Sequence, residues 1–414
     1  MQSKSAIDRS MWFFAIVYAV EGIGQASSGI MWQPLSFWLK QTMHWDPVMV
    51  STSVAVFDIP WVIKPLWGAI SDFVPLFGYR RRPYLVLANI AAILAFVWVG
   101  MLDTATTVIP ALTVTAFAMA ISSTLCGALL VETGQANNTS ATFVNQQWLW
   151  FNIAQMIATL VAGYLIEVLS PVGALHAAAG IAAIAPLAII GGVWLIGEQR
   201  ASIDLEALRE RLGALVSAFR SRDLWFVAAF LFLYYFSPGF GTPLYFQMTD
   251  RLHFSQGFIG LLSSIGAAGW IIGGLLFRWQ IHRLGRKTLL QLSILGGVLS
   301  TLSYLLLSSE TSAVIISLAG GLTSMIAMVA TMTLAVESCP KGAEGFAFAA
   351  MMSIVNLTGP LANTIGSALY EHVFNEQLAP LIIVSAAATA LVFFLIPLML
   401  YRKDGTAMGS SVEA

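Results

Sequence analysis

Long apolar runs separated by short polar segments alternate along the whole chain. Most of the runs reach about 18 residues or more, the length at which an α-helix can cross the hydrocarbon core of a bilayer. The predicted spans, about twelve, are residues 11–39, 46–72, 83–102, 107–131, 141–168, 174–196, 224–248, 255–281, 287–308, 311–337, 343–370 and 378–401. The pattern therefore predicts an all-α integral membrane protein with twelve transmembrane helices.

The composition supports this class. Of the 414 residues, 58% are hydrophobic and only 10% are charged, whereas a soluble domain carries about a quarter charged residues. The first apolar run lacks a small-residue cleavage site and continues past the length of a signal-peptide core. We therefore expect it to be retained as a membrane span.

Basic residues are distributed unevenly between the two sets of loops. If both termini are cytoplasmic, seventeen of the 20 basic residues fall on the inner side, only Lys40 and Arg251 on the outer side, and Lys64 within a span. Membrane proteins keep an excess of Lys and Arg in cytoplasmic loops. The distribution predicts cytoplasmic termini and a multi-pass protein of the bacterial inner membrane.

The longest polar segment, residues 197–223, divides the chain into residues 1–196 and 224–414, each with six predicted spans. Its apolar residues recur at helical spacing from Ile203 to Phe219, which favours an amphipathic helix lying on the membrane surface. The alternative is a solvated linker.

The two halves repeat two short patterns at nearly the same offset. Segment 68–80 recurs as 274–287, an offset of 206 for the first glycine, and "LLVE" ending at Glu132 recurs as "LAVE" ending at Glu337, an offset of 205. Two matches at corresponding places in the halves indicate a duplicated six-helix unit. Parallel repeats of this kind are typical of the major facilitator fold, so we expect two pseudo-symmetric halves.

Several stretches resemble one family of transporters. They are "IKPLWGAISD" and "PLFGYRRRPYLVL" around the second span, "SFWLKQTMHWDP" after the first, "PLYFQMTDRLHFSQGFIG" between the seventh and eighth, and "CPKGAEGFAFAAMMSIVNL" entering the eleventh. The amino-acid sequences of these stretches are similar to those of the folate-biopterin transporter family of the major facilitator superfamily. The resemblance implies a secondary transporter of a folate or pterin. The muropeptide permeases share the arginine cluster but not the sequence that flanks it.

The fourth span departs from the pattern of that family. The family carries two aspartates in a stretch ending "ALVVE", whereas the aligned "SSTLCGALLVE" has Ser123 and Gly127 in their place. The resemblance therefore supports the fold and the transport class more strongly than it supports a particular substrate.

Polar groups deep in the first two spans are candidates for substrate binding or proton coupling, because a charge near the bilayer midplane is costly and is usually functional. Glu21 lies about nine residues into the first span, roughly 13 Å from its cytoplasmic start. Gln25 follows one turn later on the same face, and Asp58 lies at a similar depth on the second span. The alternative is that Glu21 or Asp58 pairs with a buried donor and only holds helices together.

Lys64 lies about two turns from the cytoplasmic end of the second span. It could pair with Asp58, with Glu21 or with a carboxylate of the substrate. Alternatively, it is a structural part of the motif that carries the resemblance.

Polar side chains share one face of the fifth span: Trp148, Asn152, Gln155 and Thr159 follow one another at intervals of four, three and four. The eleventh span has a similar polar face, formed by Asn356 and Asn363, which are seven residues apart. Such faces point toward other helices or toward a water-filled cavity. Both a substrate cavity and simple interhelical hydrogen bonding fit the pattern.

The seventh span is interrupted by "FSPGFGTP", in which Pro238 and Pro243 each lack a backbone donor. Broken helices of this kind mark gates and binding sites in transporters. Tyr235 and the neighbouring aromatics Tyr234, Tyr245 and Phe246 could stack on a flat heteroaromatic ring. The alternative is that they pack or anchor the helix at the interface.

Charged residues at the predicted cytoplasmic ends of the spans suggest a conformational latch. Its predicted members are Asp72, Arg80, Arg81, Arg82, Glu132 and Glu337. They can form ion pairs that break as the halves move.

No metal-ligand spacing or phosphate-binding glycine loop occurs in the sequence, so we expect neither a metal nor another cofactor. The sequence shows no nucleophile paired with a base, so it does not indicate an enzyme. We predict a monomeric transporter that moves a small organic solute through the lipid bilayer by alternating access, coupled to protons, with no nucleic-acid partner. The alternatives are transport of another amphipathic solute, such as a siderophore or muropeptide, and a transporter-like receptor or assembly protein.

Overall fold

A computed structural model describes residues 4–137, 140–198, 200, 213, 222–279, 284–337 and 344–396. Within these ranges the chain is almost entirely helical, and its one β-bridge joins Leu76 to Tyr79. The chain forms two compact units, Met1–Arg211 with Met248–Ala267, and Leu212–Gln247 with Ala268–Ala414. The predicted division into residues 1–196, 197–223 and 224–414 stays a prediction, and most of the predicted amphipathic linker lies outside the described residues.

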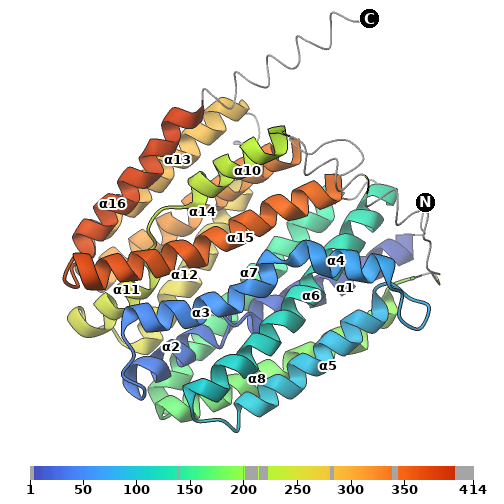
Figure 1. Cartoon of the computed structure of the whole chain (residues 1–414), viewed down its shortest axis with the longest axis horizontal. Coiled ribbons are helices and arrows are strands. Elements are labelled where there is room, and N and C mark those ends of the chain that lie inside the picture. Colours follow the sequence, from blue (N-terminus) through green and yellow to red (C-terminus); the bar gives the residue numbers. More distant parts are fainter. Residues whose placement is uncertain are drawn as a thin grey trace, which may run out of the picture. The chain divides into compact units, whose positions relative to one another are not determined.

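The first unit is a helical bundle. Its helices are α1 (Lys4–Gly24), α2 (Trp32–Gln41), α3 (Pro47–Val62), α4 (Lys64–Phe73), α5 (Arg82–Val99), α6 (Ala105–Asn137), α7 (Ser140–Val168), α8 (Pro171–Gly192) and the short η1 (Val193–Leu195). Helix α5 packs against both α6 and α8, and α1 packs mainly against α7 (Figure 1). Asp46 caps α3 by accepting a hydrogen bond from the Met49 N–H at 2.7 Å, and Ser170 caps α8 in the same way through Gly173.

The second unit contains α10 (Arg222–Tyr235), α11 (Gly241–Phe246), α13 (Arg286–Ser303), η4 (Tyr304–Leu306), α14 (Glu310–Glu337), α15 (Glu344–Ala368), η5 (Leu369–Val373), α16 (Leu378–Leu391) and η6 (Val392–Leu395). Helix η2 (Gln247–Arg251) and α12 (Gln256–Trp279) connect the two units along the chain. A buried core, which includes Leu231, Leu290 and Met351, joins α10, α13 and α15.

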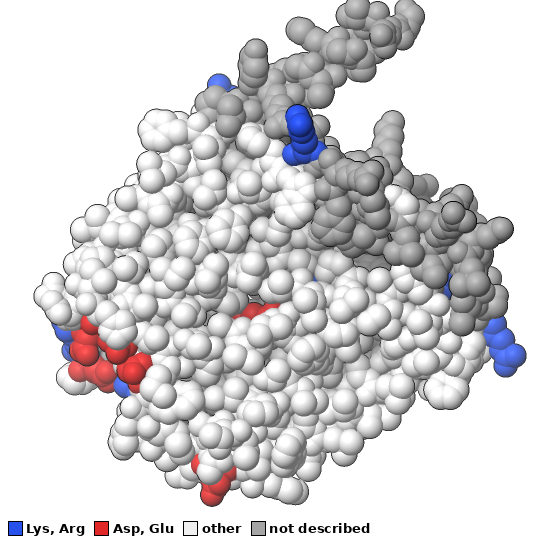
Figure 2. Space-filling view, in the orientation of Figure 1, with Lys and Arg blue, Asp and Glu red and all other residues white. Residues whose placement is uncertain are grey.

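Nine helices of the described residues are long and apolar enough to cross a membrane. Large apolar side chains such as Leu94, Ile184 and Leu275 are more than 60% exposed, as expected of surfaces that face lipid. Figure 2 shows one face on which most side chains are uncharged and the charged ones gather in a few small groups. The prediction of an all-α membrane protein is confirmed.

Three predicted spans are interrupted in the structure. The first is broken at residues 25–31, where Gly29 packs so tightly that a Cβ atom would lie 2.2 Å from the Ile23 carbonyl oxygen. The second is interrupted at Ile63, between Pro60 and Pro65. The break expected at "FSPGFGTP" is present over residues 236–240. The first break was not expected, because that predicted span, residues 11–39, contains just one proline, outside the break.

Candidate functional site

Three helices of the first unit bring Glu21, Lys64 and Ser123 together. The Lys64 Nζ donates a hydrogen bond to the Ser123 Oγ at 3.3 Å. The Ser123 hydroxyl also hydrogen-bonds with the Glu21 carboxylate, which interacts electrostatically with Lys64. The other carboxylate oxygen, Glu21 Oε2, is buried and has no hydrogen-bond partner among the described residues. We call these three residues the acid–lysine cluster.

The local chain geometry places Lys64 in this cluster. The helix break at Ile63 puts Lys64 at the first position of α4, and its ammonium group lies 4.3 Å from the centre of the Trp61 ring. A cation over an aromatic face is stabilised by the ring quadrupole. Gly68, one turn further along α4, faces α6, where a Cβ atom would lie 3.7 Å from a Thr124 methyl group, an ordinary van der Waals distance.

The two positions of α6 at which the family pattern has aspartates both face α1. Ser123 contacts Glu21, and a Cβ atom on Gly127 would lie 3.7 Å from the Tyr18 hydroxyl. Tyr18 is fully buried and hydrogen-bonds with Cys126. The carboxylate at this place is therefore supplied by α1 and not by α6.

Asp58 and Gln25 do not belong to the cluster. Asp58 accepts a hydrogen bond from the Ser27 hydroxyl at 3.0 Å, and the Gln25 carbonyl accepts from the backbone N–H groups of Ser28 and Gly29. Both residues therefore help to shape the break between α1 and α2. This agrees with the structural alternative for Asp58.

The polar face of α7 is used mainly for contacts between helices. The Gln155 side chain donates to the Ser28 carbonyl at 3.2 Å, and the Thr159 and Ser264 hydroxyl groups lie 2.9 Å apart. Asn152 is buried and donates to the Trp148 carbonyl within its own helix. The alternative of interhelical hydrogen bonding fits Thr159 directly, while Gln155 reaches the backbone of the break between α1 and α2.

In the second unit, the predicted residues support the broken seventh span. Asn363 of α15 accepts from the Thr242 N–H at 3.2 Å and donates to the Thr242 hydroxyl at 2.9 Å. The Tyr235 and Thr331 hydroxyl groups lie 2.6 Å apart, which joins α10 to α14. Asn356 is partly buried two turns before Asn363.

The arginine loop before α5 is fastened by a residue that the sequence interpretation missed. The Glu198 carboxylate accepts the backbone N–H groups of Arg80, Arg81 and Arg82 at 2.9, 2.7 and 3.0 Å. The Arg81 guanidinium is buried and donates to the Ser71 hydroxyl. The side chains of the other predicted latch residues, Asp72, Glu132 and Glu337, lie outside the described residues. Glu198 could have been found from its position in the sequence, because it is the first acidic residue after the sixth predicted span.

A second polar contact lies on the side that the sequence predicts to be external. Lys40 of α2 donates to Asp250 and to Thr249 in η2, and its side chain is only 10% exposed. Burial lowers the pKa of Lys40, while its hydrogen bond to Asp250 acts in the opposite direction. Nearby along α2, the Gln33 side chain donates to the Gln256 carbonyl at 2.7 Å. We call the Lys40–Asp250 and Gln33–Gln256 pairs the outer contact; both lie within the first unit.

The chemistry of these residues is that of ion and solute binding. No group of three or more histidine, cysteine or acidic side chains in the described parts of the chain could hold a metal ion. The acid–lysine cluster instead combines one anion, one cation and a hydroxyl that connects them. Such a group can exchange a proton or bind a carboxylate.

Comparison with known proteins identifies the family. The model of the BT1 family matches residues 24–409. The chain belongs to the BT1 family. A folate-biopterin transporter of Synechocystis sp. is 27% identical over 399 residues, which cover 91% of this chain and 78% of that protein. Folate transporter 1 of Plasmodium falciparum is 27% identical over 266 residues, which cover 62% of this chain and 51% of that one.

Solved structures with the same fold are transporters as well. The nucleoside transporter NupG superposes with a TM-score of 0.70 at 12% identity, covering 96% of this chain and 99% of that one. The D-xylose-proton symporter gives 0.73 at 13% identity, covering 94% and 97%. At these identities the likeness shows the fold alone, which is that of the major facilitator superfamily. With the BT1 relatives, it makes this chain a multi-pass membrane transporter of a small organic solute and not an enzyme.

Proposed function

We propose that this BT1 protein is a proton-coupled secondary transporter of a folate- or pterin-like anion. The observation that carries the proposal is the buried Glu21 Oε2, which has no hydrogen-bond partner in the described residues and lies in a cluster with Lys64. A carboxylate of the solute can compete with Glu21 for the Lys64 ammonium group. Glu21 is then free to take up a proton, which couples proton uptake to solute binding.

Two further points belong to this proposal. The excess of basic residues in one set of loops supports cytoplasmic termini in a bacterial inner membrane. We also propose that the protein acts as a monomer.

Uptake into proteoliposomes tests the proposal. With an inward proton gradient, labelled folic acid or pterin should accumulate above its external concentration, and collapse of the gradient with a protonophore should reduce uptake to the level of empty liposomes. Accumulation that survives the protonophore would contradict proton coupling. Uptake of a siderophore or muropeptide, without uptake of either pterin compound, would favour the alternative solutes that the exchange of aspartates for Ser123 and Gly127 suggests.

Alternating access between the predicted halves, residues 1–196 and 224–414, implies that the outer contact opens during each cycle, because Lys40 belongs to one predicted half and Asp250 to the other. In a variant whose native Cys126 and Cys339 are alanine, cysteines replacing Lys40 and Asp250 should be joined by a short bis-methanethiosulfonate linker, because the two side chains meet in the structure. Linking should reduce uptake at least about tenfold, and a reductant should restore it.

The single-cysteine variants treated with the same linker are the controls. They should keep the uptake of the untreated protein. Full uptake by the linked double variant would show that transport does not need this contact to open.

A further inference from the structure

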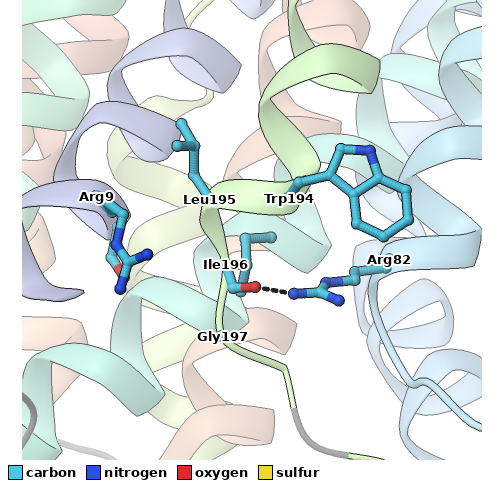
Figure 3. A pocket seen from close by; sticks show the side chains of 7 residues that line it. Arg9, Arg82, Trp194, Leu195, Ile196 and Gly197 are labelled. Atoms are coloured by element: carbon cyan, nitrogen blue, oxygen red, sulfur yellow. Dashed lines mark hydrogen bonds between the residues drawn. The ribbon is translucent and has the colours of Figure 1, made fainter.

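A pocket of about 220 Å³ lies in the first unit, away from the acid–lysine cluster. Figure 3 shows it from close by, with Arg9 of α1 on one side of the chain segment that follows α8 and Arg82 of α5 on the other. Its remaining lining is Ser10, Trp194, Leu195, Ile196 and Gly197. The transport mechanism proposed above uses none of these side chains.

The pocket is positively charged. Arg82 donates a hydrogen bond to the Ile196 carbonyl, yet its Nε is buried and has no partner among the described residues. No carboxylate in the described parts of the chain lies within ion-pair distance of the Arg9 or Arg82 guanidinium. The nearby Glu198 carboxylate already accepts hydrogen bonds from the loop backbone. Both guanidinium groups can therefore still bind an anion.

The position of the pocket relative to the membrane indicates the source of that anion. Arg82 is the first residue of one apolar span, and Leu195 is the last residue of another, so the pocket lies where two spans end. The Trp194 ring is 73% exposed, and Trp12, one turn after Arg9 on α1, is 62% exposed. Tryptophans concentrate at membrane–water interfaces, at the level of the lipid headgroups. The pocket therefore lies at the depth of the lipid phosphates.

The shape of the side chains fits a phosphate. An arginine presents a planar set of donors that matches the oxygens of a phosphate, and such charge-assisted bonds are about twice as strong as neutral ones. The Arg82 guanidinium lies near two rings, 5.6 Å from the centre of Tyr79 and 5.4 Å from that of Trp194. This packing orients the group before a ligand arrives.

We propose that this pocket binds the phosphate of an anionic phospholipid headgroup, with Arg9 and Arg82 as the phosphate ligands and Trp194 against the glycerol and acyl region. A bound lipid would connect the ends of α1, α5 and α8, and it would stabilise the first unit.

Thermal unfolding in detergent tests this site. Short-chain phosphatidylglycerol, short-chain phosphatidylcholine and inorganic phosphate are added separately to the purified full chain, and the midpoint shift is followed against concentration. Phosphatidylglycerol should stabilise the protein at lower concentration than the other two. Arg9→Gln should raise the concentration needed about tenfold or more, because a charge-assisted hydrogen bond is lost.

Arg9→Gln is the main variant because Arg9 is exposed and its loss should not affect folding. Arg82→Gln should weaken binding further, and Arg222→Gln, at an exposed arginine at the start of α10, is the matched control that should bind as the wild type does. Equal stabilisation by inorganic phosphate at the same concentrations would assign the site to a soluble anion and overturn the lipid proposal. An unchanged response of Arg9→Gln would overturn the site itself.

Discussion

Glu21→Gln should lower proton-driven uptake at least about tenfold while the protein still folds and inserts. Glutamine keeps the size of the side chain and can still hydrogen-bond with Ser123, but it can neither carry a proton nor attract the Lys64 ammonium group. A hydrogen bond to a neutral amide is weaker than one to a charged carboxylate by about 1–1.5 kcal/mol, and each 1.4 kcal/mol is about a factor of ten. Initial rates of uptake with and without a pH gradient measure the effect.

Lys64→Met separates the structural part of the pair from the functional part. Glu21 and Lys64 interact electrostatically, so loss of Lys64 leaves the Glu21 charge less well compensated. The upper bound on the cost is about 3–5 kcal/mol, the stability lost when a direct buried ion pair is broken. Lys64→Met alone should therefore lower the midpoint of thermal unfolding more than Glu21→Gln does. The double variant, which has neither charge, should recover most of that stability and still fail to transport.

A carboxylate outside the cluster provides the control. Glu167 of α7 accepts one hydrogen bond, from the Gly257 N–H at 2.8 Å, and Glu167→Gln removes a charge of the same kind. It should keep proton-driven uptake. Recovery of both stability and uptake by the Glu21→Gln and Lys64→Met double variant would mean that the pair only holds α1, α4 and α6 together.

The sequence pointed to the charged members of the acid–lysine cluster but not to the uncharged residue beside them. Glu21 and Lys64 stand out in the sequence because a charge within an apolar run is visible from its neighbours along the chain, and in the structure these two residues interact electrostatically. Ser123, which links them, carries no charge, and its place is set by how α6 packs on α1. The one sign of Ser123 in the sequence was that the family pattern has an aspartate at its position.

The polar helix faces also show that a sequence pattern does not reveal the tertiary partners of a residue. The spacing of Gln155 and Thr159 correctly places both on one face of α7, but spacing does not reveal what that face meets. Their partners, Ser28 and Ser264, lie 127 and 105 residues away along the chain. The broken seventh span could be predicted because prolines and glycines act locally, whereas the contact that holds it, with Asn363, depends on tertiary packing.

Gly366→Ala should destabilise the second unit by about 1–3 kcal/mol, the usual cost of overpacking a close contact, and it should reduce uptake strongly. A Cβ atom on Gly366 would lie 1.7 Å from the Gly239 carbonyl oxygen, which is backbone and cannot rotate away as a side chain would. Gly239 belongs to the break in the seventh span, and its N–H donates to the Ala362 carbonyl at 2.8 Å. The added methyl group therefore pushes the break away from α15.

Gly297→Ala on α13 is the matched control in the same unit. A Cβ atom there would lie 3.7 Å from a Thr389 methyl group, an ordinary van der Waals distance. Since alanine favours a helix over glycine by about 0.5–1 kcal/mol, this variant should unfold at the same or a slightly higher temperature and transport normally. The two substitutions are chemically identical, so opposite effects on the unfolding midpoint assign the loss to the contact with Gly239. If Gly366→Ala unfolded and transported as Gly297→Ala does, the break would not depend on its close packing against α15.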